Sequence, residues 1–299
     1  MINKEHISAI STGNIRAISR AISAIENENA EYLELLKNLS FNNTPVIGFT
    51  GPPGAGKSTL ISACLSYLNT LNKRVAVIAV DPSSPFSKGA LLGDRLRMNE
   101  HYLLPNVFIR SMATRGNLGG LSPQVFEVCD LLKAANFDYI FIETVGVGQS
   151  EVEIVALADT TVLVLVPEAG DEIQTIKSGI MEIADIFVLN KSDRSGADIF
   201  YKNLVQLAHE TANEDWEIPV VQTIANDKKG IEKLFEAIVS HQASKHHQEK
   251  KIELLLRKAL QLITQSRTKD LEPESIKKSI QNEYSQNFNL YKFVKRYID

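Results

Sequence analysis

The sequence predicts an α/β fold: a mostly parallel β-sheet with helices on both faces, extended by helices at its N- and C-terminal ends. From residue 45 onward, short runs of β-branched residues alternate with helical stretches, which is the pattern of βαβ units. The runs are almost continuously apolar, as strands buried on both faces are. At both ends of the chain, apolar residues recur at helical spacing without strand-like runs.

The predicted elements follow one another in a regular order. Residues 1–42 carry isoleucines and leucines at helical spacing, which predicts two or three helices before the main domain. The main domain spans residues 43–240. Its strands are expected at Val46–Thr50, Val75–Val80, Val107–Ser111, Tyr139–Glu143, Thr161–Val166, Ile186–Leu189 and Val220–Ile224. Ligands should bind beyond the carboxyl ends of these strands.

A glycine-rich turn follows the first strand. Residues 51–58 read GPPGAGKS, which matches the G-x4-G-K-[ST] pattern, and a helix follows. This strand–turn–helix context is that of a P-loop NTPase, in which backbone N–H groups surround nucleotide phosphates. Lys57 should reach the β- and γ-phosphates, and the Ser58 hydroxyl should bind Mg²⁺. The predicted nucleotide contacts in this turn are Gly51, Pro53, Gly54, Ala55, Gly56, Lys57, Ser58 and Thr59.

Carboxylates stand at the ends of two neighbouring predicted strands. Asp81 follows one strand, and Glu143 closes another, just before Gly146. Since the carboxyl ends of parallel strands meet at one edge of the sheet, both carboxylates should lie beside the P-loop. Glu143 is expected to sense Mg²⁺, and the N–H of Gly146 to contact the γ-phosphate. Helix capping is the alternative role for Asp81 and Glu143.

The tetrapeptide Asn190-Lys191-Ser192-Asp193 follows the sixth predicted strand. A carboxylate at Asp193 can accept hydrogen bonds from guanine N1–H and from its exocyclic amine, whereas adenine presents an acceptor at N1. Sites that hydrogen-bond a ligand through buried polar groups reject the wrong ligand strongly. We therefore expect GTP rather than ATP, with Asn190, Lys191 and Asp193 at the base. A helix-capping Asp193 is the alternative.

The composition changes beyond residue 240. Residues 240–251 are polar and contain His241, His246 and His247, which we interpret as part of a solvated helix or linker. Metal binding by these histidines is the less favoured alternative, because no acidic or cysteine partner accompanies them. Apolar stripes predict two further helices, Ile252–Ile263 and Phe288–Ile298. We expect residues 241–299 to form a dimerisation segment, with folding back onto the main domain as the alternative.

Charge and composition narrow the class of protein. The net charge of −4 argues against a broad surface for nucleic acid. No apolar run is long enough to cross a bilayer, and the first residues lack the features of a signal peptide. A cytoplasmic location and no membrane partner are therefore expected. Cys64 and Cys129 lie on apolar helix faces and should be buried free thiols.

Four longer motifs resemble those of the methylmalonyl-CoA mutase-associated GTPases, the MeaB/ArgK type within the metallochaperone class of P-loop GTPases. They are DPSSP at residues 81–85, LGDRLRM at 92–98, RGNLGG at 115–120 and ETVGVGQSE at 143–151. The resemblance implies a homodimeric G-protein chaperone. Such a protein binds an adenosylcobalamin-dependent acyl-CoA mutase, gates cofactor loading and protects the mutase from inactivation.

The resemblance also assigns residue roles by motif position. It implies a catalytic set of Lys57, Asp81, Asp94 and Glu143, and a Mg²⁺ site of Ser58 with the same three carboxylates. Residues 149–153 resemble a further switch that touches the mutase. The last base-contacting loop, usually Thr-Ser-Ala in the family, reads Thr223-Ile224-Ala225 here. A serine hydroxyl is lost, while backbone N–H contacts to guanine O6 are expected to remain.

Other functions stay open at this point. The chain could be a metal-insertion GTPase for nickel enzymes, an ATP-dependent kinase linked to amino-acid transport, or a binding module without turnover. A metal-insertion GTPase is less favoured because the nucleotide motifs are not accompanied by a cluster of cysteines and histidines. Asp193 argues against an ATP-dependent kinase.

No glutamine directly follows Gly146 to orient water, so hydrolysis of GTP to GDP and phosphate should be slow. Arginines that could act in cis are Arg95, Arg97 and Arg115.

Overall fold

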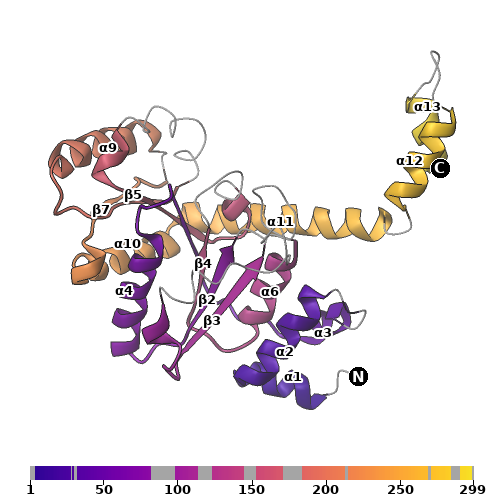
Figure 1. The fold of residues 1–299 in the computed structure, drawn as a ribbon, viewed down its shortest axis with the longest axis horizontal. Coiled ribbons are helices and arrows are strands. Elements are labelled where there is room, and N and C mark those ends of the chain that lie inside the picture. The colour runs from indigo at the N-terminus through magenta and orange to yellow at the C-terminus, as the bar shows by residue number, and fades with distance from the viewer. Residues whose placement is uncertain are drawn as a thin grey trace. The chain divides into compact units, whose positions relative to one another are not determined.

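A parallel sheet forms the centre of the fold, with the strand order β3-β2-β4-β1-β5-β6-β7 (Figure 1). The computed structural model describes residues 4–27, 29, 32–81, 98–113, 123–144, 153–170, 184–212, 215–268, 271–283 and 290–297. Within these residues, every pairing between named strands is parallel, so the predicted sheet is confirmed. The strands are β1 (Val46–Thr50), β2 (Val75–Asp81), β3 (Val107–Ala113), β4 (Tyr139–Glu143), β5 (Thr160–Leu165), β6 (Ile186–Leu189) and β7 (Val220–Gln222).

Helices cover both faces of the sheet. Apolar side chains of α4 (Lys57–Thr70), α9 (Ala197–Thr211) and α10 (Ile231–Ala243) form one core cluster with the strands. Those of α1 (Lys4–Ser11), α2 (Ile15–Glu26), α3 (Tyr32–Asn38) and α6 (Pro123–Lys133) form a second cluster. Figure 1 shows α4 and α10 on one side of the strands and α6, α2 and α3 on the other. Short 3₁₀ helices lie at Asn99–His101, Ile154–Ala156, Pro167–Gly170, Ala225–Asp227 and Lys295–Tyr297.

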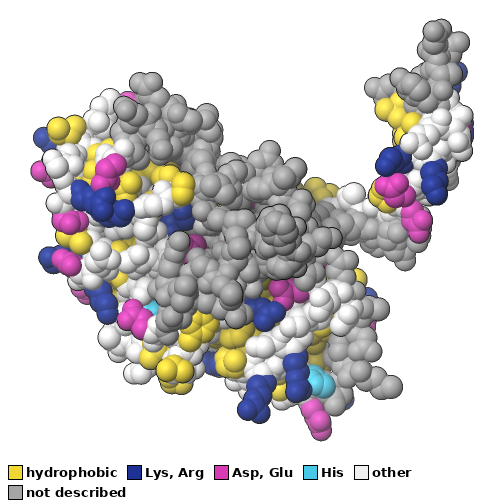
Figure 2. Space-filling model, viewed as in Figure 1, with side chains coloured by type: hydrophobic (Ala, Val, Ile, Leu, Met, Phe, Trp, Pro, Cys, Tyr) yellow, Lys and Arg dark blue, Asp and Glu magenta, His cyan; other side chains and the backbone are white. Residues whose placement is uncertain are grey.

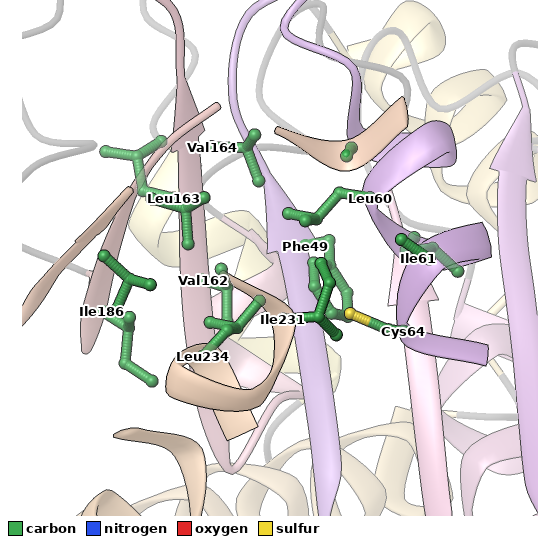
Figure 3. Close-up of a cluster of buried hydrophobic side chains, with 14 of the residues drawn as sticks. Phe49, Leu60, Ile61, Cys64, Val162, Leu163, Val164, Ile186, Ile231 and Leu234 are labelled. Carbon is green, nitrogen blue, oxygen red and sulfur yellow. The ribbon is translucent and has the colours of Figure 1, made fainter. Parts of the chain in front are cut away.

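The core beneath the P-loop helix is densely apolar. Phe49 of β1 is fully buried together with Leu60 and Cys64 of α4 and Ile231 of α10 (Figure 3). The Phe49 ring meets the Phe141 ring of β4 edge to face, with centroids 5.2 Å apart. Burying one such aromatic side chain contributes about 1.5–3 kcal/mol. This packing fixes the turn between β1 and α4. The Cys64 and Cys129 side chains are both buried, as predicted.

The N-terminal helices pack onto the same unit as the sheet. The Asn14 side chain caps α2 by accepting hydrogen bonds from the N–H groups of Arg16 and Ala17. Isoleucines at helical spacing along α2, Ile18, Ile22 and Ile25, are fully buried. On the face shown in Figure 2, described Lys and Arg side chains are interspersed with Asp and Glu rather than gathered into one patch.

The chain consists of two compact units, Met1–Lys251 and Ile252–Asp299. The C-terminal helices are α11 (Lys245–Thr268), α12 (Pro273–Glu283) and α13 (Leu290–Val294). The helix α12 was not predicted. The solvated interpretation of residues 240–251 is wrong at His241, which is completely buried. Within the described residues, none of the helices combines the length and apolarity that crossing a membrane requires.

Candidate nucleotide-binding site

The turn between β1 and α4 has a backbone that only glycine accommodates at two places. Gly51 has φ +136°, and a Cβ there would lie 2.1 Å from the Val164 carbonyl oxygen. Gly56 has φ +88°, and a Cβ there would lie 2.5 Å from Asn190 Nδ2. Both positions combine a left-handed backbone with close approach by a neighbouring strand end. The glycines of the predicted P-loop therefore shape a tight turn beside the loop that carries Asn190.

Lys57 begins α4 and is only 6% exposed. Its ammonium group donates hydrogen bonds to the carbonyl oxygens of Gly51 at 2.6 Å and Pro52 at 3.1 Å. The side chain thus points back across the P-loop rather than out to solvent. An ammonium in this position lies beside the turn that should surround the β- and γ-phosphates.

Ser58 and Glu143 meet at the carboxyl edge of the sheet. The Ser58 hydroxyl donates to Glu143 Oε1 at 2.5 Å, and both side chains are buried. Their approach follows from the strand register, because Phe49 of β1 pairs with Glu143 of β4. Two adjacent oxygen donors, one of them a carboxylate, suit the hard cation Mg²⁺. The residues present therefore fit the predicted metal.

Of the other two predicted carboxylate residues, the structure describes the backbone of Asp81. Asp81 is the last residue of β2, and Ala79, two residues earlier, pairs with Glu143. The backbone of Asp81 therefore reaches the same edge of the sheet as the P-loop. Asp94 and Gly146 lie outside the described residues, as do Arg95, Arg97 and Arg115.

Asn190 connects the predicted base-binding loops to the P-loop. Its amide nitrogen donates to the Ala55 carbonyl oxygen at 2.9 Å. Its amide oxygen accepts from Thr223 Oγ1 at 3.1 Å and from the Ala225 N–H at 3.2 Å. The side chain is almost completely buried. One asparagine thus joins three loops that come from separate parts of the sequence.

Among the other residues of the predicted base-binding loops, some hydrogen-bond to the protein and others are exposed. Lys191 donates through Nζ to the Gly54 carbonyl oxygen at 2.7 Å, which ties the loop to the P-loop a second time. The Ile224 N–H donates to the Lys229 carbonyl oxygen at 3.2 Å, so this N–H already has a partner within the protein. Asp193 is exposed, as are Pro53, Gly54 and Thr59 of the P-loop. The carboxylate predicted to read guanine is therefore accessible.

The sequence analysis missed an ion pair next to these loops. Arg194 donates a hydrogen bond to Glu168, which lies just beyond the carboxyl end of β5. This hydrogen bond from Arg194 is the main cause that lowers the pKa of the Glu168 carboxyl below its usual value. Neither residue belongs to a recognisable motif, and only the adjacency of β5 and β6 brings them together.

The chain resembles known proteins in both sequence and fold. The sequence profile of the methylmalonyl-CoA mutase-associated GTPase MeaB matches residues 18–279. A Pyrococcus horikoshii protein named as a GTPase is 49% identical over 244 residues, covering 79% of this chain and 77% of that protein. The GTPase ArgK of Escherichia coli is 36% identical over 255 residues, covering 80% and 77% respectively.

A mouse protein and a solved structure extend the comparison. The mitochondrial methylmalonic aciduria type A homolog of Mus musculus is 41% identical over 199 residues, which are 64% of this chain and 48% of that protein. The crystal structure of a LAO/AO transport system kinase aligns with a TM-score of 0.70 and 25% identity, covering 100% of this chain and 98% of that one. Relatives and fold therefore agree with the P-loop geometry.

Proposed function

Because the chain belongs to the family of methylmalonyl-CoA mutase-associated GTPases, we propose that it serves as a GTP-dependent chaperone of an adenosylcobalamin-dependent acyl-CoA mutase. The chain is a GTPase, like the relatives that it matches. In the proposed role it gates loading of the mutase cofactor and protects the mutase from inactivation. The family match over residues 18–279 carries this proposal.

The described residues support a division of labour around the triphosphate. Lys57 would bind the β- and γ-phosphates, and the N–H groups at the start of α4 would add the positive end of the helix dipole. Ser58 and Glu143 would hold Mg²⁺, with Asp81 and Asp94 as further proposed ligands. Mg²⁺ neutralises charge that develops on phosphate oxygens during transfer. Asn190, Lys191 and Asp193 would hold guanine.

A direct contact supports an output through protein conformation. Glu143 is the last residue of β4 and the first of the segment predicted to switch with the nucleotide. Its hydrogen bond with Ser58 at 2.5 Å connects that segment to the phosphate-binding helix. A change of hydrogen-bond partner at the Ser58 hydroxyl would therefore alter the contacts of Glu143, at the start of that segment. Residues 149–153, farther along the segment, would present this change to the mutase.

The choice of nucleotide favours this role over that of an ATP-dependent kinase. Asn190 and Lys191 fix the base loop to the P-loop through two hydrogen bonds, at 2.9 Å and 2.7 Å. The distance from the phosphates to the base-reading position is therefore set by the protein. Asp193 presents acceptors only, which suit guanine and repel the N1 acceptor of adenine. The word kinase occurs in the name of the solved structural relative, the LAO/AO transport system kinase, and describes that protein.

We further propose a homodimer formed through α11. In the single chain, α11 exposes a row of large apolar side chains, each between 45% and 69% accessible. Most of them recur at intervals of three or four residues and so share one helix face. Exposed apolar rows of this kind mark interaction surfaces. The row consists of Ile252, Leu255, Leu256, Leu260, Leu262 and Ile263.

The proposal is tested by mixing the full chain with adenosylcobalamin-dependent acyl-CoA mutases. Complex formation is measured with GDP and with a non-hydrolysable GTP analogue, and phosphate release from GTP is measured with and without each mutase. We expect one mutase to bind differently in the two nucleotide states and to accelerate phosphate release. Partner completion of a GTPase site contributes about 10³–10⁵-fold in related systems.

Lys57→Ala serves as the control, because it should remove both nucleotide effects without altering the α11 surface. If no mutase accelerates hydrolysis or binds in a nucleotide-dependent manner, the chaperone role is wrong. The assignment as a GTPase would survive that result.

A further inference from the structure

A second polar cluster lies at the opposite end of the sheet from the nucleotide site. Asp185 directly precedes β6, His241 lies near the end of α10, and His246 lies in the first turn of α11. Asn190 follows the other end of β6, so Asp185 and Asn190 are roughly 17 Å apart at about 3.3 Å per residue. The cluster therefore takes no part in nucleotide binding. We refer to Asp185, His241 and His246 as the amino-edge cluster.

The ligating atoms of this cluster converge on one point. Asp185 Oδ1 lies 3.3 Å from His241 Nε2 and 3.5 Å from His246 Nε2. All three atoms lie within 4.8 Å of one another. Zn²⁺ binds imidazole nitrogen and carboxylate oxygen at about 2.0–2.1 Å, so neighbouring ligands of a tetrahedral ion are about 3.3 Å apart. The two separations from Asp185 Oδ1 match that spacing.

Hydrogen bonding alone explains the cluster poorly. N–H···O hydrogen bonds in proteins are about 2.7–3.2 Å long, shorter than either separation. His241 is completely buried, yet its Nε2 makes no hydrogen bond of acceptable geometry. A buried polar atom without a partner costs about 1–3 kcal/mol. A metal ion shared with Asp185 and His246 would satisfy His241 Nε2.

The surroundings orient these side chains as outer-shell groups do in metal sites. His241 Nδ1 lies 2.9 Å from Thr160 Oγ1, which leaves Nε2 as its ligating atom. Asp185 Oδ2, the oxygen directed away from the imidazoles, accepts from the Thr161 N–H at 2.6 Å and from Lys250. The Trp216 ring stands edge-on to His241, with centroids 4.9 Å apart, and supplies an apolar wall.

We propose that Asp185, His241 and His246 form a binding site for Zn²⁺ or a divalent transition metal of the same ligand preference. Two imidazoles and one carboxylate are a donor set that zinc accepts, and they leave a fourth tetrahedral position for water. Bound metal would join the start of β6, the end of α10 and the first turn of α11. Lys250, already paired with Asp185, adds a positive charge that moderates the affinity.

The experiment uses the full chain after treatment with a chelator. Zn²⁺ is titrated calorimetrically in the presence of excess Mg²⁺, which occupies oxygen-rich sites but competes weakly for imidazole. We expect one Zn²⁺ per chain. His246→Gln should weaken binding by at least about tenfold, since even outer-shell changes cost metal sites about 10–100-fold. His246 is 30% exposed, so this variant should fold, and its retained GTP binding verifies that.

His209→Gln is the matched control, because this exposed histidine on α9 lies outside the cluster. It should bind Zn²⁺ as the wild type does. In a parallel measurement, Co²⁺ should give the visible absorption of a tetrahedral nitrogen–oxygen site in the wild type and not in His246→Gln. The proposal is overturned if the wild type binds no Zn²⁺ in excess Mg²⁺. It is equally overturned if His246→Gln binds with wild-type affinity, or if His209→Gln loses as much affinity as His246→Gln.

Discussion

Each edge of the β-sheet holds a lysine with little solvent exposure, and the two lysines have different partners. At the carboxyl edge, Lys57 donates to the carbonyl oxygens of Gly51 and Pro52, which are uncharged acceptors that a phosphate can replace. At the amino edge, Lys250 is paired with the carboxylate of Asp185. Burial alone raises the pKa of Asp185, but His241, His246 and Lys250 outweigh burial and hold that pKa well below its usual range.

The difference separates a lysine that is available to a nucleotide from a lysine that contributes to the stability of the fold. A cation held by neutral carbonyls can exchange partners when an anion arrives, whereas a cation paired with a buried carboxylate is fixed. We therefore expect substitutions at the carboxyl edge to change nucleotide binding, and loss of the Asp185 carboxylate at the amino edge to change the free energy of unfolding.

The largest effect is expected from Asp185→Asn. This change leaves the Lys250 ammonium without its buried carboxylate, and removing one partner of a buried ion pair costs about 3–5 kcal/mol. Chemical denaturation in the presence of a chelator should show this loss in the free energy of unfolding. Asp198→Asn, at an exposed position in the first turn of α9, should change it by less than about 0.5 kcal/mol. Equal effects of the two variants would contradict the structural role of the amino edge.

Lys57→Ala should mainly affect nucleotide affinity. Truncating one member of a desolvated charge pair costs about 2–5 kcal/mol of binding free energy, so GTP should bind roughly 30-fold to several thousand-fold more weakly. Equilibrium titration with a fluorescent GTP analogue measures this, with exposed Lys37→Ala as the control. The fold should survive, because α4 is held by Leu60, Ile61 and Cys64. Unchanged affinity would remove Lys57 from the phosphate site.

Asp193→Asn should have a smaller effect that is selective for the base. An amide at this position sets a donor against one of the two donors of guanine, which costs about 1–3 kcal/mol. Xanthosine triphosphate carries an oxygen in place of that amine and should bind the variant relatively better. Competition titrations give the ratio of GTP to XTP affinities. A wild-type ratio in the variant would mean that Asp193 does not read the base.

The smallest effect on folding and on GTP binding is expected from the double variant Leu255→Ser, Leu256→Ser. Both side chains are more than half exposed in the single chain, and substitutions at exposed sites change stability by about 0.5 kcal/mol or less. If α11 forms the dimer, light scattering should nevertheless report a monomer. A variant that stays dimeric would place the interface on another surface.

The carboxyl edge was largely predictable because its residues lie in contiguous motifs. Buried parallel strands show themselves as apolar runs, and the predicted β1, β4 and β6 match the structure residue for residue. The glycine-rich turn and Asn190-Lys191-Ser192-Asp193 then follow their strands at fixed positions. The contact from Asn190 to Ala55 was not predicted, because it depends on which strands are neighbours.

The amino edge could not be predicted in the same way. His241 and His246 lie in a polar stretch without a local carboxylate, and Asp185 reaches them only because β6 begins beside the end of α10. The helix α12 was missed for a different reason. Its sequence PESIKKSIQNE contains two isoleucines as its only large apolar residues, and no residue of it is buried.

Phosphate release from GTP and from ATP, measured on one preparation of the full chain in the presence of Mg²⁺, tests the central claim most directly. The account predicts slow release from GTP, markedly less from ATP, and none above background from Lys57→Ala. Equal release from ATP and GTP would contradict guanine recognition by Asp193. Release by Lys57→Ala at the wild-type rate would contradict hydrolysis at the carboxyl edge of the sheet.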